Sequence, residues 1–171
     1  RNALDNEVVI LGLCEGNHCS EKKKGDKGNG RIVAMKKEVA EDGGCQWSTL
    51  RTIKIPASAD FTDYSAITLD AASGRVAISS QEDSKVWIGK LLGKSNDGTN
   101  VWDIDAIELD DEKSKVYDFP KNDLCETVYC NVEGIHWIND NMLIAVSDKM
   151  KSSQDFRCFD KDQSVHVFTL P

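Results

Sequence analysis

Short apolar stretches bounded by turn residues recur along this chain, and their pattern predicts strands rather than helices. Short runs of β-branched residues, separated by turns rich in Gly and Asp, are typical of antiparallel hairpins. The clearest unit lies between residues 63 and 109, with strands expected at 65–69, 75–80, 85–91 and 104–109. Residues 108–116 are charged enough for a helical turn, but a loop is the simpler interpretation. We therefore expect an all-β fold.

The two flanking units are predicted to lack one strand each. Strands that match the second, third and fourth of the central unit are expected upstream, at 7–13, 31–36 and 50–55. Strands that match the first, second and third are expected downstream, at 134–138, 142–147 and 164–170. Four antiparallel strands followed by a new start are the anatomy of a propeller blade.

An internal repeat supports this division of the chain. Residues 64–69 and 75–80 align with residues 132–137 and 143–148 at one constant offset. A third, partial copy, residues 9–15, aligns with residues 76–82 at almost the same offset. Each copy of such a repeat is one supersecondary unit that buries its apolar face against its neighbours.

The sequence thus predicts about half of a β-propeller, with six blades expected in the closed ring. Blades are expected near residues 1–56, 57–118 and 119–171. Propellers close with about four to eight blades, and open sheet edges leave backbone groups unpaired, so we expect another polypeptide to complete the ring. The chain opens at Arg1 without an initiator Met, in the middle of a blade, which favours the remainder of a cleaved precursor. A second copy of the chain is the alternative.

Composition and charge narrow the possible partners. The chain has 171 residues, 40% of them hydrophobic, and no long apolar run, so no membrane span is expected. Its net charge of −8 disfavours nucleic acid, because phosphate binding requires a basic face. The same charge suits calcium or a cationic ligand, although an acidic balance is also common among soluble secreted proteins.

The cysteines point to an oxidising compartment. Their number is even, no two are spaced as a zinc or thioredoxin motif, and two pairs share the same short spacing. We therefore expect a secreted, extracellular or vacuolar protein with at least two disulfides. Spacing alone leaves fifteen pairings open, with a preference for Cys14–Cys19, Cys125–Cys130 and Cys45–Cys158.

Candidate ligands for a metal ion lie where the first strands begin. Asp63 and Ser65 stand at the start of the first strand of the central unit, and Glu133 stands at the corresponding place downstream. First strands line the central channel of a propeller, so these side chains are expected near one axis. Carboxylates that converge raise one another's pKa unless a cation binds them, and Ca²⁺ takes six to eight oxygen ligands.

Three further acids end second strands at or near one repeat position, and are expected farther from the axis: Glu15, Glu82 and Asp148. For each acid taken singly, a solvated turn is the simpler interpretation.

Residues 133–137, Glu-Gly-Ile-His-Trp, resemble the Glu-Gly-x-x-Trp opening of gluconolactonase/senescence-marker-type six-bladed propellers. In that family the Glu binds a central divalent metal, so the resemblance implies a metal-binding role for Glu133. The family's usual Pro after the Gly is Ile135 here, and its other ligands have no counterpart on this chain. Residues 13–19, 63–67 and 156–171 are similar to secreted plant propeller proteins without an assigned activity, which implies a fold and a compartment rather than a function.

Two classes of function are compatible with these patterns. The first is a secreted binding protein that holds a ligand or partner at the propeller face or channel, with Ca²⁺ as a candidate cofactor. The alternative is a metal-dependent hydrolase of a lactone, ester or phosphate ester, with Glu133 as a ligand and His136 as the acid or base. No Gly-x-Ser-x-Gly elbow and no spaced catalytic triad occur, which favours binding.

Overall fold

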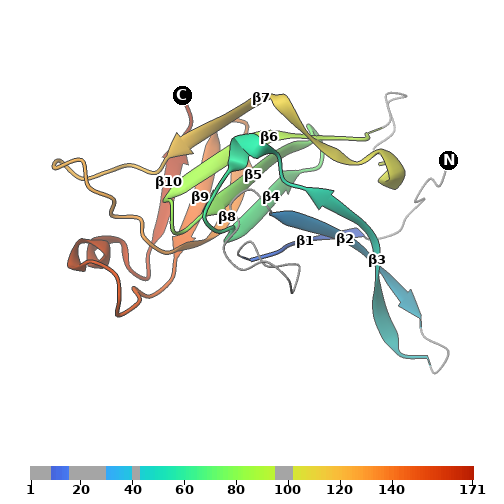
Figure 1. Cartoon of the computed structure of the whole chain (residues 1–171), viewed down its shortest axis with the longest axis horizontal. Coiled ribbons are helices and arrows are strands. Elements are labelled where there is room, and N and C mark those ends of the chain that lie inside the picture. Colours follow the sequence, from blue (N-terminus) through green and yellow to red (C-terminus); the bar gives the residue numbers. More distant parts are fainter. Residues whose placement is uncertain (1–8, 16–29, 40–42, 95–101) are drawn as a thin grey trace.

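The chain folds into three antiparallel sheets with almost no helix, as a computed structural model shows (Figure 1). The structure describes residues 9–15, 30–39, 43–94 and 102–171. Three short 3₁₀ helices, Ala57–Ala59 (η1), Ile104–Ala106 (η2) and Phe156–Lys161 (η3), are the helical elements of the described residues. The prediction of an all-β fold is confirmed.

Each sheet is built from strands that follow one another along the chain. The first contains β1 (Val9–Leu13), β2 (Arg31–Val39) and β3 (Cys45–Lys54) in that order. The central sheet contains β4 (Ala66–Asp70), β5 (Arg75–Ser80), β6 (Lys85–Leu92) and β7 (Glu108–Asp118). The last contains β8 (Val132–Asn139), β9 (Met142–Ser147) and β10 (Val165–Thr169), with β10 beside β9.

The segment that follows β6 differs from its prediction. The sequence predicts a closing strand at 104–109 and a loop at 108–116; instead, Ile104–Ala106 form a 3₁₀ helix and Glu108–Asp118 form β7. Asp103 caps the 3₁₀ helix by accepting a hydrogen bond from the backbone N of Asp105, 3.1 Å away. The charges of β7 are tolerated because it is the outer strand of its sheet and most of its side chains face solvent.

The central sheet is covered on both faces by the other two sheets. On one face, Val76, Ile78 and Trp87 pack with Ile32 and other residues of the first sheet. On the other face, Ala77 and Val86 pack with the buried side chains of the last sheet, which are Val132, Ile135, Trp137, Leu143 and Ala145. Figure 1 shows the central sheet between its two neighbours, with the outer end of the β2–β3 hairpin extending away from the stack.

The stacking also shows where the sequence repeat misaligns. In the first strands, Ile67 and Ile135 both face the preceding sheet, and their spacing is the predicted offset. In the second strands, Ile78 and Ala145 occupy equivalent positions, because both face the preceding sheet. These two residues are one residue closer in the sequence than the repeat predicts. The turn between β8 and β9 is two residues shorter than the turn between β4 and β5, because Asn139 pairs with Met142 whereas Asp70 pairs with Arg75. A bulge between Trp137 and Asn139 adds one residue back, so one residue is missing in total.

Candidate functional site

The junction between the central and last sheets brings together residues at one repeat position. β4 lies beside β8, so the first strands of successive sheets are neighbours. Thr68 and His136 occupy the same repeat position, and the Thr68 hydroxyl lies 3.3 Å from His136 Nδ1. Contact between equivalent residues of consecutive units is expected when the units are related by a rotation about a common axis.

Ser65, a predicted metal ligand, joins the two sheets. Its hydroxyl donates a hydrogen bond to the backbone O of Val132, 2.8 Å away, and lies 3.0 Å from Ser79 Oγ. Its backbone N donates to Ser79 O at 2.9 Å. These contacts tie the start of β4 both to its own neighbour β5 and to the next sheet.

Asp63, a second predicted ligand, is buried and ties the start of β4 to the turn after β5. It is 6% exposed, and its Oδ1 accepts hydrogen bonds from Ser80 Oγ and from the backbone N of Glu82, the latter at 3.2 Å. Its Oδ2 is buried and has no hydrogen-bond partner among the described residues. Asn131, at the corresponding position of the last sheet, makes a similar link by donating from Nδ2 to Lys149 O at 3.0 Å.

Asp83 is not among the sequence candidates, although it completes this polar group. It accepts hydrogen bonds from the backbone N and the hydroxyl of Thr62, at 2.6 and 3.2 Å, and its own backbone N donates to Ser80 Oγ at 3.0 Å. Ser80 therefore connects the carboxylates of Asp63 and Asp83. The signal for this role was the position of Asp83 in the tight turn between two predicted strands, where a short acid commonly caps backbone amides.

Glu133 and His136 of the last sheet occupy the repeat positions of Ser65 and Thr68, and both side chains are exposed. Glu133 holds the position that Ser65 holds in the central sheet, and it has no hydrogen bond or ion pair within the described part of the chain. No group of three or more His, Cys, Asp or Glu side chains that could hold a metal ion occurs among the described residues. The metal-binding roles of Glu133, Asp63 and Ser65 and the catalytic role of His136 therefore stay predictions.

The three acids that end second strands are all exposed: Glu15, Glu82 and Asp148. Their solvated positions agree with the simpler interpretation of each acid taken singly.

The cysteine pairing differs from the preferred one. Cys130 is bonded to Cys158, with Cα atoms 5.6 Å apart, while Cys45 and Cys125 are free and exposed. The predicted Cys125–Cys130 and Cys45–Cys158 pairs are therefore wrong. The tertiary fold, rather than the spacing of the cysteines, brings the sulfurs of Cys130 and Cys158 together. Cys14 is disulfide-bonded, and its predicted partner Cys19 lies outside the described residues.

A hydrogen bond supports the observed disulfide. Gln154 Nε2 donates to Cys130 O at 2.7 Å, which holds the segment before η3 against the loop that contains Cys130.

The outward face of the last sheet is mostly apolar and open to solvent, with His136 opposite Ile144 on the same side. Its side chains alternate with those that are buried against the central sheet, and we refer to five of them as the open face: Ile138, Ile144, Val146, Val165 and Val167. Val146 is 46% exposed and Val167 is 52% exposed. Pairing of Val165 with Val146 and of Val167 with Ile144 places these four on one side of the sheet. No described residue covers this side.

The fold and this junction define an all-β protein built from stacked antiparallel sheets. Comparison of the chain with protein-family models, with curated proteins and with solved structures finds no match. Among the described residues, no helix is long and apolar enough to cross a membrane.

Proposed function

We propose that this chain is a binding protein that forms part of a β-propeller, and that its open face docks against a further sheet of the same repeat carried by another polypeptide. The observation that carries the proposal is the difference between equivalent residues of successive sheets. Thr68 is 6% exposed because the last sheet covers it, whereas its counterpart His136 is exposed. In the same way Ser65 donates to the next sheet, whereas Glu133 has no such neighbour among the described residues.

The apolar composition of the open face supports docking to a sheet. The corresponding face of the central sheet, which includes Ala77 and Val86, is buried against the last sheet in one continuous cluster. Four of the open-face side chains, those of Ile138, Val146, Val165 and Val167, are about half exposed, so covering each of them would contribute roughly 1 kcal/mol. Contiguous exposed apolar area of this kind is typical of interaction surfaces.

A ring completed in this way would place Glu133 at an inner junction, next to the first strand of the following sheet. Because Glu133 is predicted to lie at that channel, we expect a ligand to bind there, with Ca²⁺ as a candidate cofactor. Residence in the secretory pathway or outside the cell is supported by the Cys130–Cys158 disulfide. The similarity to secreted plant propeller proteins and the hydrolase alternative stay predictions.

The test is the composition of the native particle that contains this chain. Purified through an affinity tag and separated under denaturing, reducing conditions, it should give this chain and a second polypeptide. Peptide sequencing of the second band should show short β-strand units of the same repeat. Replacing Val146 by Lys should release the second polypeptide, because a charge would be buried at the junction.

Val116→Lys is the matched control, because Val116 lies on β7 of another sheet and is 41% exposed, close to the 46% of Val146. It should leave the particle intact. A particle with the mass of one copy, or one that Val146→Lys does not dissociate, overturns the proposal. A particle of two identical copies also overturns it in favour of the homodimer.

A further inference from the structure

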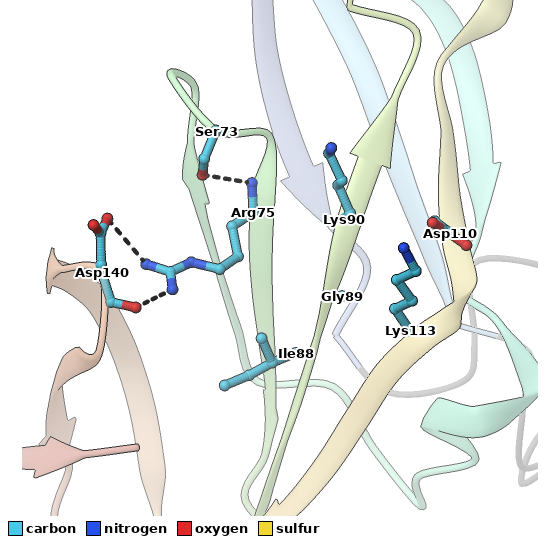
Figure 2. Close-up of a pocket in the computed structure, with 8 residues that line it drawn as sticks. All are labelled: Ser73, Arg75, Ile88, Gly89, Lys90, Asp110, Lys113 and Asp140. Carbon is cyan, nitrogen blue, oxygen red and sulfur yellow. Dashed lines mark hydrogen bonds and ion pairs between the residues drawn. The ribbon is translucent and has the colours of Figure 1, made fainter. Parts of the chain in front are cut away.

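A cavity of about 470 Å³ lies on the central sheet, at the end of β4 opposite to Asp63 and Ser65. Figure 2 shows residues of β5, β6 and β7 around it, with Asp140 of the β8–β9 turn at one side. Its volume is within the range of small-molecule sites, and its lining combines charged side chains with apolar surface.

Three cationic side chains line this cavity: Arg75, Lys90 and Lys113. Lys90 and Lys113 form no ion pair with any described residue. Ile88 and Gly89 of β6 supply an apolar floor beside these side chains. Two unpaired ammonium groups beside an apolar surface are suited to an anion that carries a hydrophobic body.

Arg75 is held rigidly at one wall. Its guanidinium carbon lies 4.0 Å from the centre of the Trp137 ring, and its Nη2 donates to Asn139 O at 3.2 Å. Nη1 donates to the backbone O of Asp140. A cation fixed by stacking and by backbone carbonyls keeps its charge close to the cavity without being neutralised by a buried carboxylate.

The opposite wall is a bulge in β7. Ile88 pairs with Lys115 and Lys90 pairs with Asp110, so residues 111–114 lie outside the regular pairing, opposite Gly89. This bulge carries Lys113 to the cavity. Bulges of this kind re-aim side chains and are common next to functional sites.

The bulge is anchored from the opposite face of the sheet. Trp87 Nε1 donates to Ser58 Oγ at 2.8 Å, and Ser58 Oγ in turn contacts Asp111 Oδ1 and Ser114 Oγ. A Cβ atom on Gly89 would lie 2.1 Å from the Trp87 ring, so only glycine allows Trp87 to lie across β6 at this point. The wall that presents Lys113 is therefore fixed by these hydrogen bonds and by close packing.

The nearby acids leave the cavity with an excess of positive charge. Asp110 and Asp140 line it as well, so the three cations exceed the acids by one in a chain whose net charge is −8. Asp110 Oδ1 accepts a hydrogen bond from the backbone N of Glu112 at 3.0 Å. Asp140 is fully exposed and lies 3.8 Å from the Arg75 guanidinium. Neither acid forms an ion pair with Lys90 or Lys113.

We propose that this cavity binds a small organic anion, with a carboxylate or phosphate group between Lys90 and Lys113 and an apolar body on Ile88. The site is independent of the open face and of the predicted channel. It adds a ligand class, amphipathic anions, to a protein proposed above to bind a partner chain.

Titration of the purified native protein with phenyl phosphate and with benzoate tests the site, and inorganic phosphate and phenol are the reference ligands. At least one of the two aromatic anions should bind saturably by calorimetry, and more tightly than phosphate or phenol. If phenyl phosphate binds more tightly than benzoate, the site is suited to a phosphate ligand. The reverse order indicates a carboxylate ligand. Lys90→Gln and Lys113→Gln should each weaken binding about fivefold to tenfold, as expected for loss of one charge-assisted hydrogen bond.

Lys85→Gln is the matched control, because Lys85 lies at the other end of β6, outside the cavity lining. It should leave the affinity unchanged. The proposal is overturned if neither aromatic anion binds saturably, if phenol binds as well as they do, or if the three Lys→Gln variants bind alike.

Discussion

Removing the Cys130–Cys158 bond should destabilise the last sheet by an amount that the length of the closed loop determines. The two cysteines are 28 residues apart in the sequence. A loop of that size gives about 3.6 kcal/mol at 25 °C from the chain-entropy relation. For a domain of this length, each kcal/mol corresponds to about 2–4 °C in melting temperature, so the Cys130→Ala/Cys158→Ala variant should melt roughly 7–14 °C lower.

The assay is thermal and urea unfolding of the native protein, followed by tryptophan fluorescence under non-reducing conditions. Cys125→Ala is the control, because Cys125 is free and exposed on a neighbouring turn. It should unfold like the unmodified protein. Equal melting temperatures for the double variant and the control would refute the entropy argument, and a peptide map that joins Cys125 to Cys130 would refute the pairing itself.

Two further predictions concern the core and the pH dependence of stability. Leu143→Ala should destabilise the protein by about 3 kcal/mol in urea unfolding, because Leu143 is 2% exposed between the last two sheets. Val116→Ala should cost less than half as much, because Val116 is 41% exposed on the outer strand β7. Burial and the charge of Lys161 lower the pKa of His166 from its ordinary 6.5, so the folded state binds this proton less readily than the unfolded state. Stability should therefore be full above about pH 6.5 and decline as the pH falls below it. His166→Gln should make the urea midpoint less dependent on pH between about 5 and 7, and an unchanged dependence contradicts the assignment.

The polar group at the start of β4 could be located from the sequence only in part. Asp63 and Ser65 were found because they stand at the start of a predicted first strand. Their actual contacts, with Ser80 and with the backbone of Val132, depend on the turn after β5 and on the neighbouring sheet. A strand pattern gives the position of a side chain along the chain, but not which neighbour accepts its hydrogen bond.

The sequence by itself determined the strands and their grouping, because alternation and turn residues are local properties. β5 and β9 have the predicted limits, and the repeat correctly paired Thr68 with His136. The extent of β7 was missed because its charges are stable only on an outer strand.

Only the tertiary structure decided which distant residues meet. The Cys130–Cys158 bond depends on the way η3 folds back on an earlier loop, so spacing could not reveal it. The cavity beside Lys113 depends on a bulge in β7 and on the Trp87 ring that lies across Gly89. Such contacts arise from packing between elements far apart in the chain, whereas the strand pattern records only the periodicity within each element.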